Sequence, residues 1–122
     1  MGRDRNREII AKYPWLDIND EQLTLLDTLP IGWHGLILDM CKELKRELVK
    51  HDLVSKYEIL EAKEKWCMLR WYDGLCDLSP MPSTITNIVC KYEERSKEVC
   101  MICGAPKPKD QEMCDVCMER YG

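Results

Sequence analysis

Apolar residues recur at three- and four-residue intervals between residues 35 and 51, which is the clearest pattern in the chain. This spacing places one apolar stripe on an α-helix and leaves the charged side chains on the other face. We therefore predict a helix over about 35–51, with its charged face in solvent. The predicted stripe consists of Leu36, Ile37, Met40, Cys41, Leu44, Leu48 and Val49.

Shorter patterns before this segment predict two more helices. Residues 3–12 can form a helix that turns Ile9 and Ile10 inward and ends before Pro14, because the residue preceding a proline is pushed out of the α region. A second short helix is expected to begin at a cap formed by Asn19 or Asp20 and to stop before Pro30. The Pro and Gly residues of 30–35 indicate a turn.

The segment after residue 56 favours β-structure. Residues 57–63 and 66–72 are predicted to be two strands, the second rich in the aromatic residues that favour strands. Glu64 and Lys65 would then lie at the reversal, although no Asn-Gly signal is present there. A single helix over residues 53–66 is the alternative, since Glu, Ala and Lys favour helix.

A last helix is predicted to start at Ser83, whose hydroxyl can accept an unpaired backbone N–H. Ile85, Ile88, Val89 and Tyr92 would form its apolar face. Together the elements indicate an α+β fold, with helices packed on a β-hairpin or small antiparallel sheet. We expect a core domain over residues 1–99 and a zinc-binding module over residues 100–122 that packs on it.

Four cysteines near the end of the chain have the spacing of a structural zinc site. Cys100 and Cys103 form one CxxC pair, and Cys114 and Cys117 form another after ten intervening residues. Two such pairs can surround one Zn²⁺ with four thiolates and leave no position for a substrate. Gly104 follows the first pair, where a positive φ would let the backbone turn towards the sulfurs. We therefore predict one structural Zn²⁺ in a zinc-knuckle or ribbon module.

Two local disulfides, a redox-active CxxC pair or an iron–sulfur cluster are the alternatives for these cysteines. The first residues, MGRDRNREII, contain no apolar signal segment, so we expect a reducing cytoplasm, in which disulfides are disfavoured. No apolar run approaches the ~20 residues that span a bilayer, so no membrane association is expected. The other four cysteines, Cys41, Cys67, Cys76 and Cys90, are predicted to be buried as small apolar side chains.

Net charge and the absence of catalytic motifs disfavour two classes of function, nucleic-acid binding and catalysis. The formal net charge is −4, which disfavours binding to a phosphate backbone. No Gly-rich phosphate loop or nucleophile–base signature is present, so we expect the protein not to be an enzyme. A protein partner is favoured. A small nucleic-acid-binding zinc protein or regulator is the alternative, and requires a basic patch from Lys63, Lys65, Arg70, Lys107 and Lys109.

Residues 63–72 read KEKWCMLRWY and resemble the KEKFGxLRFY block of a family of small uncharacterised phage and prophage proteins. Those proteins also carry a Gly-Trp before an amphipathic helix, matched here by Gly32-Trp33, and a Glu-x-Ser before a CxxCG knuckle, matched by residues 94–96 and 100–104. Trp66 and Cys67 depart from the pattern, which has Phe and Gly there. The resemblance implies a phage-encoded, zinc-bearing α+β protein.

Size, acidity and this resemblance together suggest a protein that docks on a host or phage factor, for example to inhibit a defence system such as a CRISPR nuclease. Aromatic and Arg side chains dominate interface energetics, so the conspicuous residues of the block are the candidates for contact. Arg70, among large apolar residues, is expected either to pair with an acidic neighbour or to reach a partner. The candidate partner-binding residues are Trp33, Lys63, Lys65, Trp66, Arg70, Trp71 and Tyr72.

Overall fold

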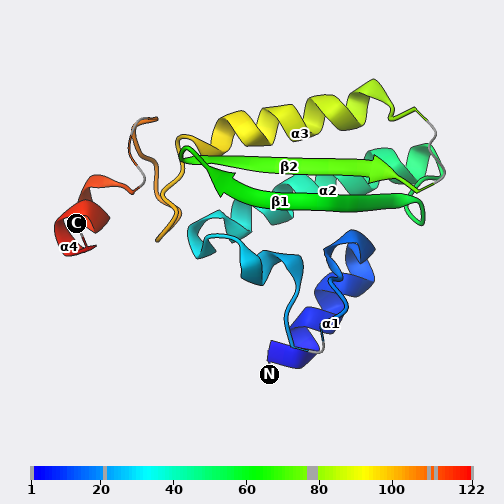
Figure 1. Cartoon of the computed structure of the whole chain (residues 1–122), viewed down its shortest axis with the longest axis horizontal. Coiled ribbons are helices and arrows are strands. Elements are labelled where there is room, and N and C mark those ends of the chain that lie inside the picture. Colours follow the sequence, from blue (N-terminus) through cyan, green and yellow to red (C-terminus); the bar gives the residue numbers. More distant parts are fainter. Residues whose placement is uncertain (1, 21, 77–79, 110, 112, 122) are drawn as a thin grey trace.

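A two-stranded antiparallel sheet and two long helices form the centre of the molecule (Figure 1). The computed structural model describes residues 2–20, 22–76, 80–109, 111 and 113–121. The α+β prediction is confirmed. The elements in chain order are α1 (Gly2–Lys12), three 3₁₀ helices η1 (Pro14–Leu16), η2 (Leu25–Thr28) and η3 (Ile31–Trp33), α2 (His34–Lys50), β1 (Tyr57–Lys65), β2 (Met68–Leu75), α3 (Ser83–Ser96) and α4 (Asp115–Tyr121).

The main core lies where α2, α3 and the hairpin meet. Alternate residues of β2, Leu69 and Trp71, are buried, as the period of two along a strand requires. The apolar stripes of α2 and α3 meet them, so that burial of these faces supplies the main driving force for folding. The fully buried side chains of this core include Leu16, Trp33, Ile37, Met40, Cys41, Leu44, Leu48, Leu69 and Ile85.

The hairpin is confirmed, but its reversal lies two residues later than predicted. Lys65 pairs with Met68, so Trp66 and Cys67 form a two-residue turn rather than the start of the second strand. Both turn residues have positive φ, 56° for Trp66 and 62° for Cys67, as a type I′ turn requires. This turn matches the twist of the strands, and the gain in pairing over Glu64 and Lys65 outweighs the local strain of two non-glycine residues.

The segment before α2 differs from the predicted second helix. Asp20 accepts hydrogen bonds from the backbone N–H groups of Gln22 and Leu23 at 2.8 and 3.0 Å, which makes a turn and not a helix cap. Only the short η2 follows, preceded by Thr24, whose N–H donates to the Asp27 carboxylate at 2.7 Å. Neither Asn19 nor Asp20 therefore caps a helix.

Helices α2 and α3 agree with their predicted patterns except at single positions. Val49, assigned to the apolar stripe of α2, is 61% exposed, because it lies on the far side of the stripe defined by Ile37, Leu44 and Leu48. Ser83 is the first residue of α3 rather than its cap, and no side-chain cap hydrogen bond is formed there.

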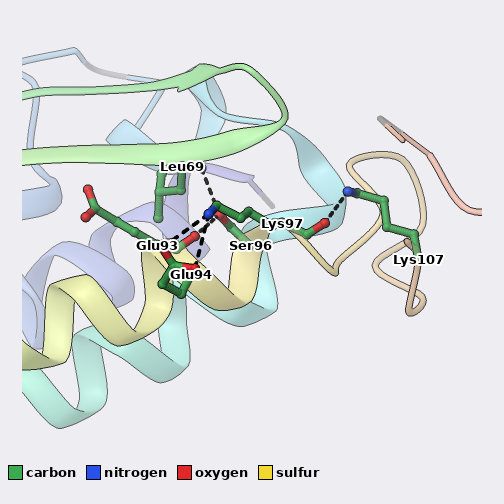
Figure 2. A network of polar contacts seen from close by, with 6 residues as sticks. All are labelled: Leu69, Glu93, Glu94, Ser96, Lys97 and Lys107. Atoms are coloured by element: carbon green, nitrogen blue, oxygen red, sulfur yellow. Dashed lines mark hydrogen bonds and ion pairs between the residues drawn. The ribbon is translucent and has the colours of Figure 1, made fainter. Parts of the chain in front are cut away.

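Polar contacts join α3 both to α2 and to β2. The Glu43 carboxylate on α2 accepts a hydrogen bond from Lys91 Nζ at 2.7 Å and another from the Tyr92 hydroxyl. At the end of α3, the buried Ser96 hydroxyl accepts a hydrogen bond from the Leu69 N–H at 2.8 Å (Figure 2). Ser96 therefore ties the end of α3 to the start of β2.

Candidate metal centre

The four predicted cysteine ligands converge. The Sγ atoms of Cys100, Cys103, Cys114 and Cys117 all lie within 4.8 Å of one another. Four thiolates around a tetrahedral Zn²⁺, with Zn–S of about 2.3 Å, would lie about 3.8 Å apart, so a small contraction would bring this cluster to that geometry. The cluster can therefore hold one metal ion.

The backbone around the first CxxC pair forms a tight loop that directs N–H groups at sulfur. The Cys100 N–H donates to the Ala105 carbonyl at 2.8 Å, and the Gly104 N–H donates to the Cys100 carbonyl at 3.0 Å. Gly104 has the expected positive φ, +82°. The Ile102 N–H points at Cys100 Sγ at 3.4 Å, an outer contact typical of thiolate ligands.

Backbone N–H groups near the sulfur also lower the pKa of the Cys100 thiol. Burial raises the pKa of the Cys100 thiol, but N–H groups of Cys103, Cys114 and Ile102 outweigh it and lower that pKa to about 6. Burial, together with the neighbouring thiols, raises the pKa of Cys117 to about 12. A bound cation would reverse the second shift, because metal binding removes the proton.

The first cysteine loop packs directly on the segment that begins α2. The Gly32 N–H donates to the Met101 carbonyl at 2.8 Å. A Cβ atom at Gly32 would lie 2.1 Å from the Cys100 carbonyl oxygen, and one at Gly104 would lie 2.9 Å from the Gly32 oxygen. Glycine at both positions is therefore what allows the two backbones to approach.

Trp33 fixes the same junction from the core side. Its side chain is completely buried, and its indole N–H donates to the Val99 carbonyl at 3.0 Å, immediately before the first cysteine. The Gly-Trp pair of the sequence analysis is thus the attachment point of the metal segment. The sequence could not reveal this role, since the contacting residues lie 66 positions apart.

Lys107 holds the outgoing part of the loop. Only 6% of this residue is exposed, and its Nζ donates to the carbonyl oxygen of Lys97 (Figure 2). The same Nζ also donates to the Pro108 carbonyl at 3.2 Å. Its N–H also donates to the Glu98 carbonyl at 3.0 Å. A lysine assigned by sequence to a possible basic patch therefore acts as an internal brace.

The remaining predicted contact residues fall into two groups. Trp33 and Trp71 are buried, so neither offers a surface to a partner. Trp66, at the hairpin turn, is 82% exposed, and Tyr72 is 46% exposed. Lys65 is also exposed, and Lys63 pairs with Glu61 at 3.1 Å.

Arg70 is half-buried beside Glu93. The Arg70 charge lowers the pKa of the Glu93 carboxyl, although burial, the larger effect, raises it overall. The Glu93 carboxylate instead accepts the Trp71 N–H at 2.9 Å, and Arg70 Nε is buried with no hydrogen-bond partner among the described residues. Arg70 therefore lies near an acidic residue, but no ion pair joins their side chains among the described residues, so the expected pairing is not formed.

The four other cysteines do not share one environment. Cys41 is fully buried and accepts the Trp15 indole N–H at 3.3 Å, and burial raises the pKa of its thiol to about 12. Cys67 is half-buried at the turn, whereas Cys76 and Cys90 are exposed. The prediction of burial is therefore correct for Cys41 and wrong for Cys76 and Cys90.

Comparison of the chain with family models, curated proteins and solved structures found no significant match. Among the helices of the described ranges, none has the length and apolar character needed to cross a bilayer. What the chain does must therefore be argued from its own residues.

Proposed function

We propose that the chain is a non-enzymatic, zinc-stabilised module that docks on another protein. The bound Zn²⁺ would be held by Cys100, Cys103, Cys114 and Cys117 and would supply structural stabilisation. Zinc is favoured over other metals by four thiolates in two CxxC pairs around one centre. Such a site has no open coordination position, which supports a structural role.

The metal would stabilise the junction with the core as well as the tail itself. The buried sulfur cluster is separate from the main core, and among the described residues its further apolar contacts are Ala105 and Met113. So small a cluster supplies little hydrophobic stabilisation, and the metal–thiolate bonds would replace it. Ordering the first loop would in turn fix the backbone against Gly32.

One observation supports the docking surface. Trp66 projects from the hairpin turn with 82% of its surface exposed, while Trp15, Trp33 and Trp71 are buried. Exposed Trp residues are enriched at the centres of protein interfaces. The turn that presents Trp66 has positive φ at two non-glycine residues, a strained geometry of the kind that clusters at binding sites.

The hairpin turn and the metal segment lie towards the same end of the molecule (Figure 1). The proposed surface consists of the turn and the exposed side chains beside it, Lys65, Trp66 and Tyr72. The proposed partner is a host or phage protein, and inhibition of a defence nuclease is the biological role that would fit the resemblance. The nucleic-acid alternative is weakened, because Lys107 is buried and Lys63 is paired.

Two measurements test the proposal. Protein purified without chelator should contain about one zinc per chain, and a content below about 0.5 zinc per chain would contradict the metal site.

The docking surface is tested by affinity capture from lysate of a phage host, in which Trp66→Ser should lose a specific partner that the parent chain retains. Leu60→Ser is the matched control, because Leu60 is 66% exposed on the same hairpin away from the turn. Equal capture by Trp66→Ser and the parent would exclude the turn as the docking surface.

A further inference from the structure

Several cations of α2 gather on the flank that faces the segment after α1. Glu43 faces α3, where Lys91 and Tyr92 bind its carboxylate. Lys42, Lys45 and Lys50 lie away from that contact. Arg46 lies between the two flanks, because it also lines the cleft that Glu43 and Glu47 form with α3. On the flank that faces the segment after α1, a groove of about 500 Å³ is lined by Tyr13, Lys42, Lys45, Arg46, Val49 and Lys50, and we call it the α2 basic groove.

None of the described residues that line this groove carries a carboxylate, although the chain as a whole is acidic. Lys50 pairs with Glu47 at 3.2 Å and lies in the last turn, where the helix dipole favours a cation. Across the described part of the chain, no ion pair joins Lys42, Lys45 or Arg46 to an acidic group. Lys42 and Arg46 are also four residues apart, a like-charge spacing that disfavours the helix.

Two residues give the groove an apolar part, which we call its floor. They are Val49, which is 61% exposed, and Tyr13, whose ring centroid lies 5.8 Å from Lys45 Nζ. An exposed apolar side chain ringed by cations complements a ligand that carries both carboxylates and an apolar group. A bare polyanion would leave Val49 without a partner.

We propose that the α2 basic groove binds an acidic peptide segment of a partner protein, with a large aliphatic or aromatic side chain of the segment seated on Val49 and Tyr13. Lys42, Lys45 and Arg46 would face its carboxylates. A nucleic-acid strand is disfavoured by the net charge of −4, which repels a long polyanion beyond the groove. This surface lies at the far end of α2 from the metal segment, so it is distinct from the hairpin turn (Figure 1).

The test uses the full, metal-loaded chain and a fluorescein-labelled peptide rich in Asp and Glu with one central Leu, at low salt. We expect measurable binding by anisotropy, and a loss of about tenfold or more in the Lys42→Gln/Lys45→Gln/Arg46→Gln variant. The matched control is Arg7→Gln/Lys109→Gln/Arg120→Gln, which removes the same charge from exposed positions that belong to neither proposed surface. The control should remain within about twofold of the parent.

A second arm isolates the apolar floor. Val49→Gln in the protein, or Leu→Ser in the peptide, should each weaken binding by about threefold or more. The loss of binding free energy when both changes are made should be smaller than the sum of the two separate losses. Thermal unfolding of each variant excludes misfolding as the cause. The proposal is overturned by no peptide binding, by equal loss in the charge control, by tighter binding of a mixed-sequence oligonucleotide, or by self-association that disappears in the groove variant.

Discussion

The backbone N–H of Gly32 donates a hydrogen bond to the carbonyl oxygen of Met101 at 2.8 Å, within the first cysteine pair. At this distance the two backbone segments leave no room for a side chain, and a Cβ at Gly32 would lie 2.1 Å from the Cys100 carbonyl oxygen. The metal segment is therefore attached to the core through direct backbone contact. A change in the core at this point should alter the positions of the cysteine sulfurs.

Gly32→Ala is expected to weaken both the fold and metal retention. The Cβ clashes with backbone atoms, which cannot rotate away as a side chain can, so one of the two segments must move. We expect a loss of about 2–3 kcal/mol in the free energy of unfolding of the metal-loaded protein, together with faster transfer of zinc to a chelator. Chemical denaturation and a colorimetric chelator assay measure the two effects.

Gly35→Ala is the control for that substitution. Gly35 lies three residues along the chain, inside α2, and a Cβ there would meet nothing within 4 Å. Alanine favours helix over glycine, so stability should rise by about 0.5–1 kcal/mol with zinc release unchanged. Equal zinc retention in both variants would show that the Gly32 contact does not support the metal site.

The metal ligands could be predicted because a CxxC pair brings its own two sulfurs together locally, whatever the rest of the fold does. The residues that surround the ligands could not be predicted, because Gly32 and Trp33 contact a segment that is distant in the sequence and no local pattern connects the two. The brace formed by Lys107 was hidden for another reason. A lysine between prolines ordinarily lies in solvent, and only the carbonyl oxygens of the folded loop explain its burial.

The hairpin turn supplies a second prediction. Cys67 has a φ of 62°, a region that costs a non-glycine residue roughly 1–2 kcal/mol. Cys67→Gly should remove this strain, and after allowing for the greater freedom of glycine in the unfolded chain, stability should rise by about 0.5 kcal/mol. Cys67→Ala is the control, because it also lacks the thiol but keeps Cβ. Denaturant midpoints should rank Gly above Ala, and the reverse order would contradict the strained turn.

The same turn explains why the strands were predicted and their reversal was not. Alternation of buried Leu69 and Trp71 with more exposed neighbours identifies β2 from its own residues. The usual Asn-Gly signal is absent, so the reversal was assigned to the most polar residues, Glu64 and Lys65. Pairing along the whole hairpin overrides that local preference and places Trp66 and Cys67 at the turn.

Ser96→Ala tests the link between α3 and β2. The Ser96 hydroxyl is fully buried, accepts the Leu69 N–H at 2.8 Å and donates to the Glu93 carbonyl at 2.6 Å. Its removal leaves a buried N–H without a partner, which should cost about 1–3 kcal/mol of stability. Ser83→Ala, at an exposed position with no cap hydrogen bond, should change stability by less than about 0.5 kcal/mol. Urea unfolding of both variants decides whether the hydroxyl matters.

Glu43 gives the α2–α3 contact a defined pH dependence. Hydrogen bonds from Lys91 and then Tyr92 lower the pKa of the Glu43 carboxyl below its ordinary value of 4.5. The ionised form is therefore favoured by folding, so the stabilisation is complete above about pH 4.5 and is lost as the pH falls through the lower folded-state pKa.

Glu43→Gln should accordingly destabilise the protein at neutral pH by about 1 kcal/mol, since the carboxylate is partly exposed and its charge is screened. At acidic pH, below the folded-state pKa, the protonated carboxyl resembles the amide and the difference between variant and parent should shrink towards zero. Loss of metal in acid affects both proteins alike, so it does not enter the difference. Urea titrations of the parent, Glu43→Gln and the exposed control Glu58→Gln at several pH values provide the comparison. A difference that stays constant from neutral to acidic pH would mean that the Glu43 side chain acts through packing and not through its charge.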